Sequence, residues 1–231
     1  MDVGTMIDPN ALAKGHNDAL YTSNKRRYTR YRWPIISRYI TSHSTVLDVG
    51  CGSGELLDVL IDKAVCVAGY DPSLDAVTRA KECISPTELT TDMRTLTTTY
   101  DVITCFHVLQ YATNKHQLLD HIVDRLTPNG YVIIGVPKEK SLYNWLSGAS
   151  FPADWEVIPK HPDLRLIRTY LGEPAYLSHQ TSLHKTCIKW MIRGVERVLS
   201  LANSLSAKLP FMSFKNAKPS YIQSHTTLQL P

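Results

Sequence analysis

The sequence has no apolar run that approaches the roughly 20 residues of a membrane-spanning helix. Residues 1–10 lack the charged start and the long apolar run of a secretory signal. Its five cysteines are an odd number, scattered and without a Cys-x-x-Cys pair, which argues against a disulfide framework or a zinc site. No internal repeat or low-complexity stretch is present. We therefore expect a cytoplasmic protein with reduced thiols and no transmembrane segment.

Length and composition favour one α/β domain with appendages, since 231 residues with 43% hydrophobic and 20% charged side chains are ordinary for a globular chain. Charge is uneven along the chain. Residues 1–40 carry seven Lys/Arg against three Asp, residues 41–200 carry fifteen Lys/Arg against eighteen Asp/Glu, and residues 201–231 carry three Lys and no acid. Two basic arms thus flank a mildly acidic middle. Such arms are typical of solvated helix faces and also of surfaces that bind polyanions or anionic lipids.

Apolar patterning predicts strands that alternate with helices in the first two thirds of the chain. Short β-branched and apolar runs predict strands at residues 45–50, 65–70, 100–106 and 131–136. Helical spacing of apolar residues predicts helices at residues 55–63, 73–83 and 116–126, with Ser73 as the N-cap of the second. The sequence Pro128-Asn129-Gly130 predicts a turn before the last of these strands. This alternation indicates a parallel sheet with helices on both faces.

The flanking regions give weaker patterns. Residues 16–41 are predicted as helical segments that lead into the core, and residues 149–180, interrupted by prolines, as a long irregular insertion. Further elements are predicted as a short helix at 141–148, a helix at 182–193 that Gly194 caps, and a last strand at 220–230. Residues 195–201 fit a continued helix and a strand equally well.

A glycine-rich segment follows the first predicted strand and reads Val46-Leu47-Asp48-Val49-Gly50-Cys51-Gly52-Ser53-Gly54. Glycines at this place let ligand atoms approach the backbone closely. Gly50 and Gly52 fit the dinucleotide pattern Gly-x-Gly-x-x-Gly, but its third glycine is replaced by Glu55 and an extra glycine stands at Gly54. These departures, together with Asp48 inside the strand, argue against NAD.

The segment resembles the first motif of the class I S-adenosylmethionine-dependent methyltransferases, apolar-apolar-Asp-apolar-Gly-x-Gly-x-Gly. Further resemblances follow in order over about residues 44–137: Asp71 after the second strand, Thr91-Asp92-Met93, the fourth motif at residues 100–110, and the Leu-Thr-Pro-Asn-Gly-Tyr turn at residues 126–131. Residues 174–183 are similar to a segment of the small-molecule O-methyltransferases of the ubiquinone-biosynthesis type. This similarity favours a strand at residues 195–201.

The resemblance implies a Rossmann-like, seven-stranded, mostly parallel sheet with helices on both faces. It also implies one structural domain, in which residues 1–43 form an N-terminal helical cap and residues 44–231 the methyltransferase domain. An insertion after strand five, at about residues 138–185, would complete the cap.

The cofactor that the resemblance implies is S-adenosyl-L-methionine. Asp71 would hold both ribose hydroxyls, since one carboxylate can accept from two neighbouring donors, and Asp92 would accept from the adenine amino group. Asp48 also fits a structural role in holding the loop, and Glu55 is predicted as a solvated residue that favours the helix dipole. The predicted cofactor-binding residues are Asp48, Gly50, Cys51, Gly52, Gly54, Asp71, Pro72, Asp92, Met93, Phe106 and His107.

Two histidines are the candidate catalytic residues. Methyl transfer to a hydroxyl benefits from a general base, and histidine is the usual one near neutral pH. His107 follows the fourth strand, at the methyl end of the cofactor in this fold; a contact with the loop or with the methionine moiety is its alternative role. His179 is the second candidate, and Tyr21 and Tyr111 are predicted to line the acceptor pocket.

Metal chemistry is not expected. The ubiquinone-type relatives often carry Glu-x-x-Glu-His after the fourth strand, where a metal has been proposed, whereas this chain has His107, Gln110 and Tyr111 at those positions. One imidazole without a carboxylate is a poor divalent site.

Three functions are compatible with the sequence. The first is a methyltransferase acting on a hydroxyl or amine of a small molecule. The second is an RNA methyltransferase, in which basic and aromatic residues contact phosphates and bases; its candidates are Lys25, Arg26, Arg27, Tyr28, Arg30, Tyr31, Arg32 and Trp33. The third is a cofactor-binding protein without catalysis.

Overall fold

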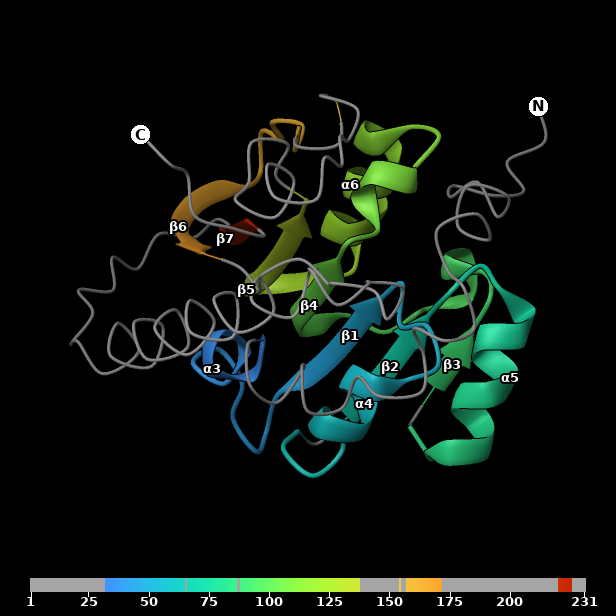
Figure 1. The fold of residues 1–231 in the computed structure, drawn as a ribbon. Coiled ribbons are helices and arrows are strands. Elements are labelled where there is room, and N and C mark those ends of the chain that lie inside the picture. The colour runs from blue at the N-terminus through green and yellow to red at the C-terminus, as the bar shows by residue number, and fades with distance from the viewer. Residues whose placement is uncertain are drawn as a thin grey trace, which may run out of the picture.

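The computed structural model describes residues 32–137 except Val65 and Thr87, and in addition Asp154, residues 157–171 and residues 220–225. Seven strands form one sheet in the order β3-β2-β1-β4-β5-β7-β6 (Figure 1). The strands are β1 (Thr45–Val49), β2 (Cys66–Tyr70), β3 (Glu88–Thr90), β4 (Tyr100–Phe106), β5 (Leu126–Val136), β6 (Arg165–Leu171) and β7 (Ser220–His225).

All six strand pairings are parallel, which confirms the predicted sheet type. β1 lies between β2 and β4, so the chain leaves β1 toward one edge of the sheet and later returns to its other side at β4. The loops that follow β1 and β4 therefore diverge at the carboxyl ends of neighbouring strands. This topological switch point is where open parallel sheets bind their ligands.

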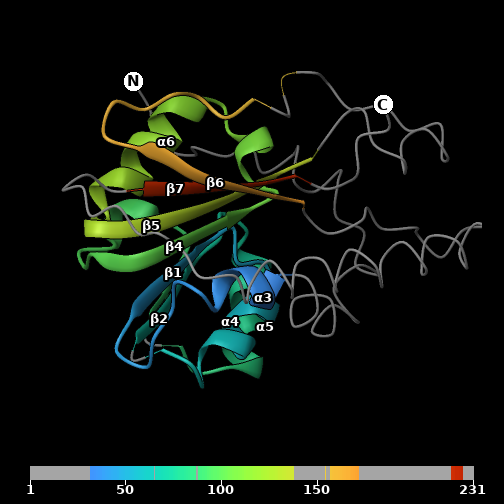
Figure 2. The ribbon, with the colours of Figure 1, turned by 90° about the vertical axis from the view of Figure 1, so that its left-hand side faces the viewer.

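Helices cover both faces of the sheet, as predicted. Figure 2 shows α6 on one face and α3, α4 and α5 on the other. The α-helices are α3 (Trp33–Ile36), α4 (Glu55–Leu60), α5 (Leu74–Cys83) and α6 (Lys115–Asp124), and two 3-10 helices, η3 (Met93–Thr95) and η4 (Leu109–Tyr111), follow β3 and β4.

Two apolar clusters fill the space between the sheet and its helices, because successive strand residues point to opposite faces. Along β1, Val46 packs with Leu56 and Leu60 of α4, whereas its neighbour Leu47 packs with Leu118 of α6 on the other side. Asp48 follows Val46 by two residues, so its side chain belongs to the α4 face of the sheet.

Polar side chains cap the starts of α5 and α6. The Ser73 hydroxyl accepts from the Ala76 N–H at the start of α5, which confirms the predicted N-cap. Asn114 does the same for α6, accepting from the Gln117 N–H, so this helix begins at Lys115.

The structure corrects two predictions. The segment predicted as irregular, residues 149–180, contains strand β6, whose backbone pairs with β7. The predicted turn Pro128-Asn129-Gly130 lies inside β5 as a bulge, because the pairing with β4 jumps from Tyr100↔Leu126 to Val102↔Tyr131. The strand β3, which no pattern indicated, is short and pairs only along three residues of β2.

Several predictions lie outside the described residues: the helical segments before Arg32, the helices at 141–148 and 182–193, and the choice between helix and strand at 195–201. The predicted last strand is confirmed at Ser220–His225. No helix among the described residues is long and apolar enough to cross a membrane.

Candidate cofactor and methyl-transfer site

The glycine-rich loop turns tightly at the carboxyl end of β1 and is tied to the end of β2. The backbone N–H groups of Gly50 and Cys51 both donate to the Tyr70 carbonyl, at 2.7 and 3.0 Å, and the Gly54 N–H donates back to the Cys51 carbonyl at 3.0 Å. Gly50, Gly52 and Gly54 all have positive φ, a conformation that side chains oppose. The loop thus needs its glycines for shape as well as for access.

Gly50 also leaves the space that the segment after β4 occupies. A Cβ atom at this position would lie 2.0 Å from Cγ2 of Val108, so Val108 rests directly on the glycine loop. At the other end of the loop, a Cβ on Gly54 would lie 2.6 Å from Cδ1 of Ile84, beyond the end of α5. The loop is therefore held between the β4 end and α5, with no room for a side chain at Gly50 or Gly54.

Asp71, at the end of β2, is hydrogen-bonded to the glycine loop. Its carboxylate accepts from the Gly52 N–H through Oδ2 and from the Ser73 N–H through Oδ1, both at 2.9 Å, and the residue is buried. Pro72 follows as a half-buried residue between these contacts.

Asp48 is buried beneath the loop and is hydrogen-bonded across the sheet. The register places it between Gly69 of β2 and Thr104 of β4, and the Thr104 hydroxyl donates to Asp48 Oδ1 at 2.6 Å. Burial raises the pKa of Asp48 to about 7, and the carboxylates of Asp71 and Glu55 add to the increase. The Thr104 hydrogen bond and the positive charge of Arg32 oppose it.

The raised pKa of Asp48 predicts a loss of stability with increasing pH in the cofactor-free protein. The folded state holds the Asp48 proton more tightly than the unfolded chain does. Protonated Asp48 therefore contributes fully to the free energy of unfolding below about pH 4, and this contribution is lost as the pH rises through about 7. The difference amounts to roughly 4 kcal/mol. We expect Asp48→Asn, which keeps an acceptor for Thr104, to unfold with a smaller pH dependence and to exceed the wild type in stability at pH 8. Chemical denaturation at pH 5 and pH 8 measures this; equal pH slopes in both proteins would contradict it.

Glu55 departs from its prediction. It stands in the first turn of α4 as expected, but it is half-buried instead of solvated, and its Oε1 atom is buried without a hydrogen-bond partner. Burial raises its pKa, whereas the positive charge of Arg32 lowers it. The reason is the close packing of the loop, which brings this carboxylate toward Asp48 and Arg32 instead of toward water.

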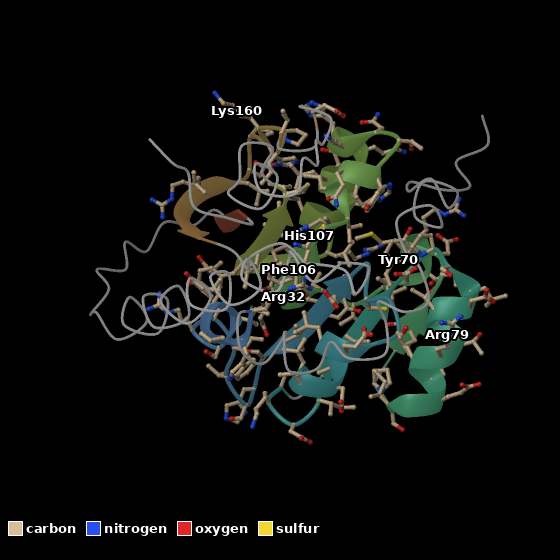
Figure 3. All side chains as sticks on the ribbon, viewed as in Figure 1. Arg32, Tyr70, Arg79, Phe106, His107 and Lys160 are labelled. Atoms are coloured by element: carbon tan, nitrogen blue, oxygen red, sulfur yellow. The ribbon has the colours of Figure 1, made fainter. Side chains whose placement is uncertain are left out.

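Arg32 and Phe106 form a contact over the carboxyl ends of the central strands. The guanidinium carbon lies 4.6 Å from the centroid of the buried Phe106 ring, a cation–π geometry. Figure 3 shows Arg32, Phe106 and His107 grouped over the ends of β1 and β4, with Tyr70 at the end of β2. Arg32, one of the predicted phosphate-binding residues, thus packs on the site; Lys25 to Tyr31 lie outside the described residues.

His107 directly follows β4 in an unusual backbone conformation. Its φ is 57°, in the left-handed region, and its N–H donates to the Gly135 carbonyl at 2.8 Å. It lies between Phe106, which Arg32 covers, and Val108, which rests on Gly50. The backbone therefore places His107, a half-buried residue, directly before the residue that packs on the glycine loop.

Asp92 begins η3 and holds Arg94. The Arg94 side chain donates to both carboxylate oxygens, and this hydrogen bonding lowers the pKa of Asp92. Met93 is fully buried in the core on the α6 side of the sheet. Cys51 is buried as well, and burial raises the pKa of its thiol, so it serves as a small loop side chain and not as a nucleophile.

Gln110 and Tyr111 lie in η4, beyond His107. Gln110 is buried and its Oε1 has no hydrogen-bond partner, while burial raises the pKa of the Tyr111 hydroxyl and a hydrogen bond with Gln110 opposes this. An amide, a neutral phenol and one imidazole do not fit a divalent cation. Within the described parts of the chain, no group of three His, Cys, Asp or Glu residues could hold a metal ion.

Sequence reasoning missed Thr104 and Arg94. The pairing of β1 with β4, which brings Thr104 beside Asp48, is the feature that identifies Thr104. Arg94 could have been noticed as a positive charge two residues after Asp92. Of the predicted site residues, Tyr21 and His179 lie outside the described residues.

Comparison with known proteins gives the family. A family described as "Methyltransferase domain" matches residues 21–229, which is most of the chain. The chain belongs to this methyltransferase family. Membership confirms the resemblance in the sequence, the Rossmann-like fold, and S-adenosylmethionine as the cofactor of an enzyme of this class.

Individual relatives of this methyltransferase are distant. The ubiquinone biosynthesis O-methyltransferase of Paraburkholderia xenovorans is 27% identical over 69% of this chain and 75% of the relative. The mitochondrial ubiquinone biosynthesis O-methyltransferase of Schizosaccharomyces pombe is 26% identical over 54% of this chain, and the match spans about half of the relative, 52%. Among solved structures, the plantazolicin methyltransferase BpumL with a pentazolic desmethylPZN analog and SAH is 21% identical, with a TM-score of 0.46 over 61% of this chain and 57% of the other.

Proposed function

We propose that this methyltransferase moves the methyl group of S-adenosylmethionine to a hydroxyl group of a small molecule, with His107 as the general base. The names of the O-methyltransferase relatives support the choice of a hydroxyl. The observation that carries the proposal is the backbone position of His107, which follows β4 with a left-handed φ and directly precedes Val108, the residue that packs on Gly50.

The residues of the loop fit the cofactor. Gly50, Gly52 and Gly54 give the loop its tight, positive-φ turn, and Asp71, which accepts from the Gly52 N–H, is proposed to accept from the ribose hydroxyls as well. Asp92 is proposed to accept from the adenine amino group. Asp48, which is buried and bonded to Thr104, supports the loop from below. When bound, the cofactor supplies a methyl group already activated on a sulfonium.

The chain's own task is to place the acceptor in line and to remove its proton. The imidazole of His107 would take the proton of the acceptor hydroxyl as its oxygen becomes bonded to the methyl carbon. Phe106 and Arg32 would close the site beside it, and Tyr111 would line the acceptor side. Residues 1–43 and the parts of 138–185 outside β6 are proposed to complete the pocket, with Tyr21 and His179 among them.

The acceptor class is tested with cofactor that carries a labelled methyl group. Purified protein is incubated with a panel of phenols of graded acidity, with matched anilines, and with total RNA. We expect label in the phenols. Label in RNA alone would favour the RNA reading, and label in anilines alone an N-methyltransferase. Cofactor binding without transfer to any substrate class would favour a non-catalytic protein; each of these outcomes contradicts the proposal.

The role of His107 is tested by His107→Asn, since asparagine tolerates the left-handed backbone but is no base. We expect kcat to fall about 10²- to 10⁴-fold, as for loss of a general base, with the Kd of S-adenosylhomocysteine unchanged. The loss should shrink as the acceptor phenol becomes more acidic, because an ionised acceptor needs no base. A uniform loss across the phenols would assign His107 to positioning instead.

A further inference from the structure

The Asp92–Arg94 pair is more ordered than an ordinary surface ion pair. Arg94 Nε donates to Oδ1 at 2.8 Å and Nη2 to Oδ2 at 2.7 Å, so the guanidinium grips both oxygens as a fork. Arg94 Nε also donates to Oδ2 at 3.1 Å, and the backbone N–H of Arg94 adds a fourth bond, to Oδ1 at 3.0 Å. The side chains of Arg94 and Asp92 keep 51% and 38% of their surface exposed, so the pair contributes little to folding.

The backbone of Asp92 is fixed as firmly as its side chain. Its N–H donates to the Thr90 hydroxyl at 3.0 Å, and its carbonyl accepts from the Thr95 hydroxyl at 2.7 Å. Thr90 in turn joins this segment to the end of β2, because its carbonyl accepts from the Asp71 N–H at 3.2 Å. Asp92 is thus built onto the same edge of the sheet that carries Asp71.

The charges of Asp71, Asp92 and Arg94 all act on Tyr70 at the end of β2. Burial raises the pKa of Tyr70 to about 12, the negative charges of Asp71 and Asp92 add to the increase, and the positive charge of Arg94 opposes it. Tyr70 is also the residue whose carbonyl receives the two N–H groups of the glycine loop. Loop, Asp71, Asp92 and Arg94 therefore converge on one strand end.

We infer that Arg94 is a positioning residue for the cofactor's base: its fork holds the ionised Asp92 carboxylate in one orientation, so that the site selects a 6-amino group. The inference rests on the proposed role of Asp92. An ionised carboxylate only accepts hydrogen bonds, so the amino group of adenine suits it, while a 6-oxo group in its place meets a second acceptor and is rejected.

The test compares the Kd of S-adenosylhomocysteine with that of S-inosylhomocysteine, whose base carries the 6-oxo group. We expect the wild type to prefer the adenosyl compound and Arg94→Ala to reduce this preference about tenfold, the size of one hydrogen bond, with an unchanged unfolding temperature. Arg94→Lys, which keeps the charge but not the fork, should resemble Arg94→Ala. Arg79→Ala, which removes an exposed arginine of α5 (Figure 3), is the matched control and should keep the wild-type preference.

A double-mutant cycle with Asp92→Asn separates positioning from direct contact. We expect Asp92→Asn to reduce the preference as well, and Arg94→Ala to add nothing in that background. An unchanged preference in Arg94→Ala, an equal loss in both backgrounds, or tighter binding of S-adenosylhomocysteine by Arg94→Ala would overturn the inference. An unchanged preference in Asp92→Asn would overturn it together with the assignment of Asp92. If the wild type prefers S-adenosylhomocysteine to S-inosylhomocysteine and the variants behave as expected, but no hydroxyl compound is methylated, the proposed function is contradicted and the inference about Arg94 stands.

Discussion

Replacing Asp71 by asparagine is expected to raise the Kd for S-adenosylhomocysteine at least about 100-fold, the effect of losing two charge-assisted hydrogen bonds. The carboxylate accepts from Gly52 on one oxygen and from Ser73 on the other. An asparagine must turn its NH₂ group toward one of these backbone donors, so the loop loses a contact, and the ribose loses its charged acceptor. Isothermal titration with S-adenosylhomocysteine measures the change.

Asp101→Asn is the matched control for Asp71→Asn. Asp101 makes the same kind of carboxylate contacts at the opposite, amino end of the strands, accepting from the Thr45 N–H at 2.9 Å and from the Thr127 hydroxyl at 3.1 Å. Its replacement should lower the unfolding temperature but leave cofactor affinity unchanged. If Asp71→Asn behaved in the same way, Asp71 would be a structural residue of the loop and not a cofactor ligand.

Gly50→Ala is expected to destabilise the protein by about 3 kcal/mol and to abolish cofactor binding. A left-handed φ costs an alanine about 1 kcal/mol, and overpacking in a filled site typically costs 1–3 kcal/mol. Both costs apply here, since φ is 75° and the new Cβ would lie 2.0 Å from Val108 Cγ2. The unfolding temperature should fall by roughly 6–12 °C for a chain of this size.

The two costs at Gly50 can be separated by adding Val108→Ala. This removes the two Val108 methyl groups, at 2.0 and 3.2 Å from the new Cβ, and leaves the Val108 Cβ at 3.1 Å. We expect the double variant to be more stable than the sum of the single variants predicts, because the closest clash is removed while the backbone cost stays. Strict additivity in thermal unfolding would show that Val108 does not rest on the loop.

The central sheet and the glycine loop were predictable because their signals are local. Buried parallel strands are continuous apolar runs. The glycine spacing, with Glu55 in place of the third dinucleotide glycine and Asp48 inside the strand, distinguishes this loop from a dinucleotide site. Ser73 likewise predicts the start of its helix, because its hydroxyl accepts from an N–H only three residues further along the chain.

What the sequence did not predict depends on contacts made at a distance. Strand β6 pairs with β7, which follows it only after residues 172–219. Its own residues carry no clear periodic pattern, so the strand could not be predicted without knowledge of this distant partner. Glu55 looks like a solvated first-turn residue in any helix, and only the packed loop makes it half-buried. The bulge at Asn129 uses the same residues as a turn, and its pairing with β4 decides between the two.

The order of strands sets the order in which the sheet can be completed. In the described sheet, β7 lies between β5 and β6 although it is the last of the seven along the chain. During synthesis, β6 emerges before the strand that joins it to the sheet, and β5 keeps an open edge until residues 220–225 arrive. The glycine loop, β1, β2 and β4 need no such late partner. The cofactor half can thus assemble early, while the half toward β6 has to wait for the final strand to close the gap.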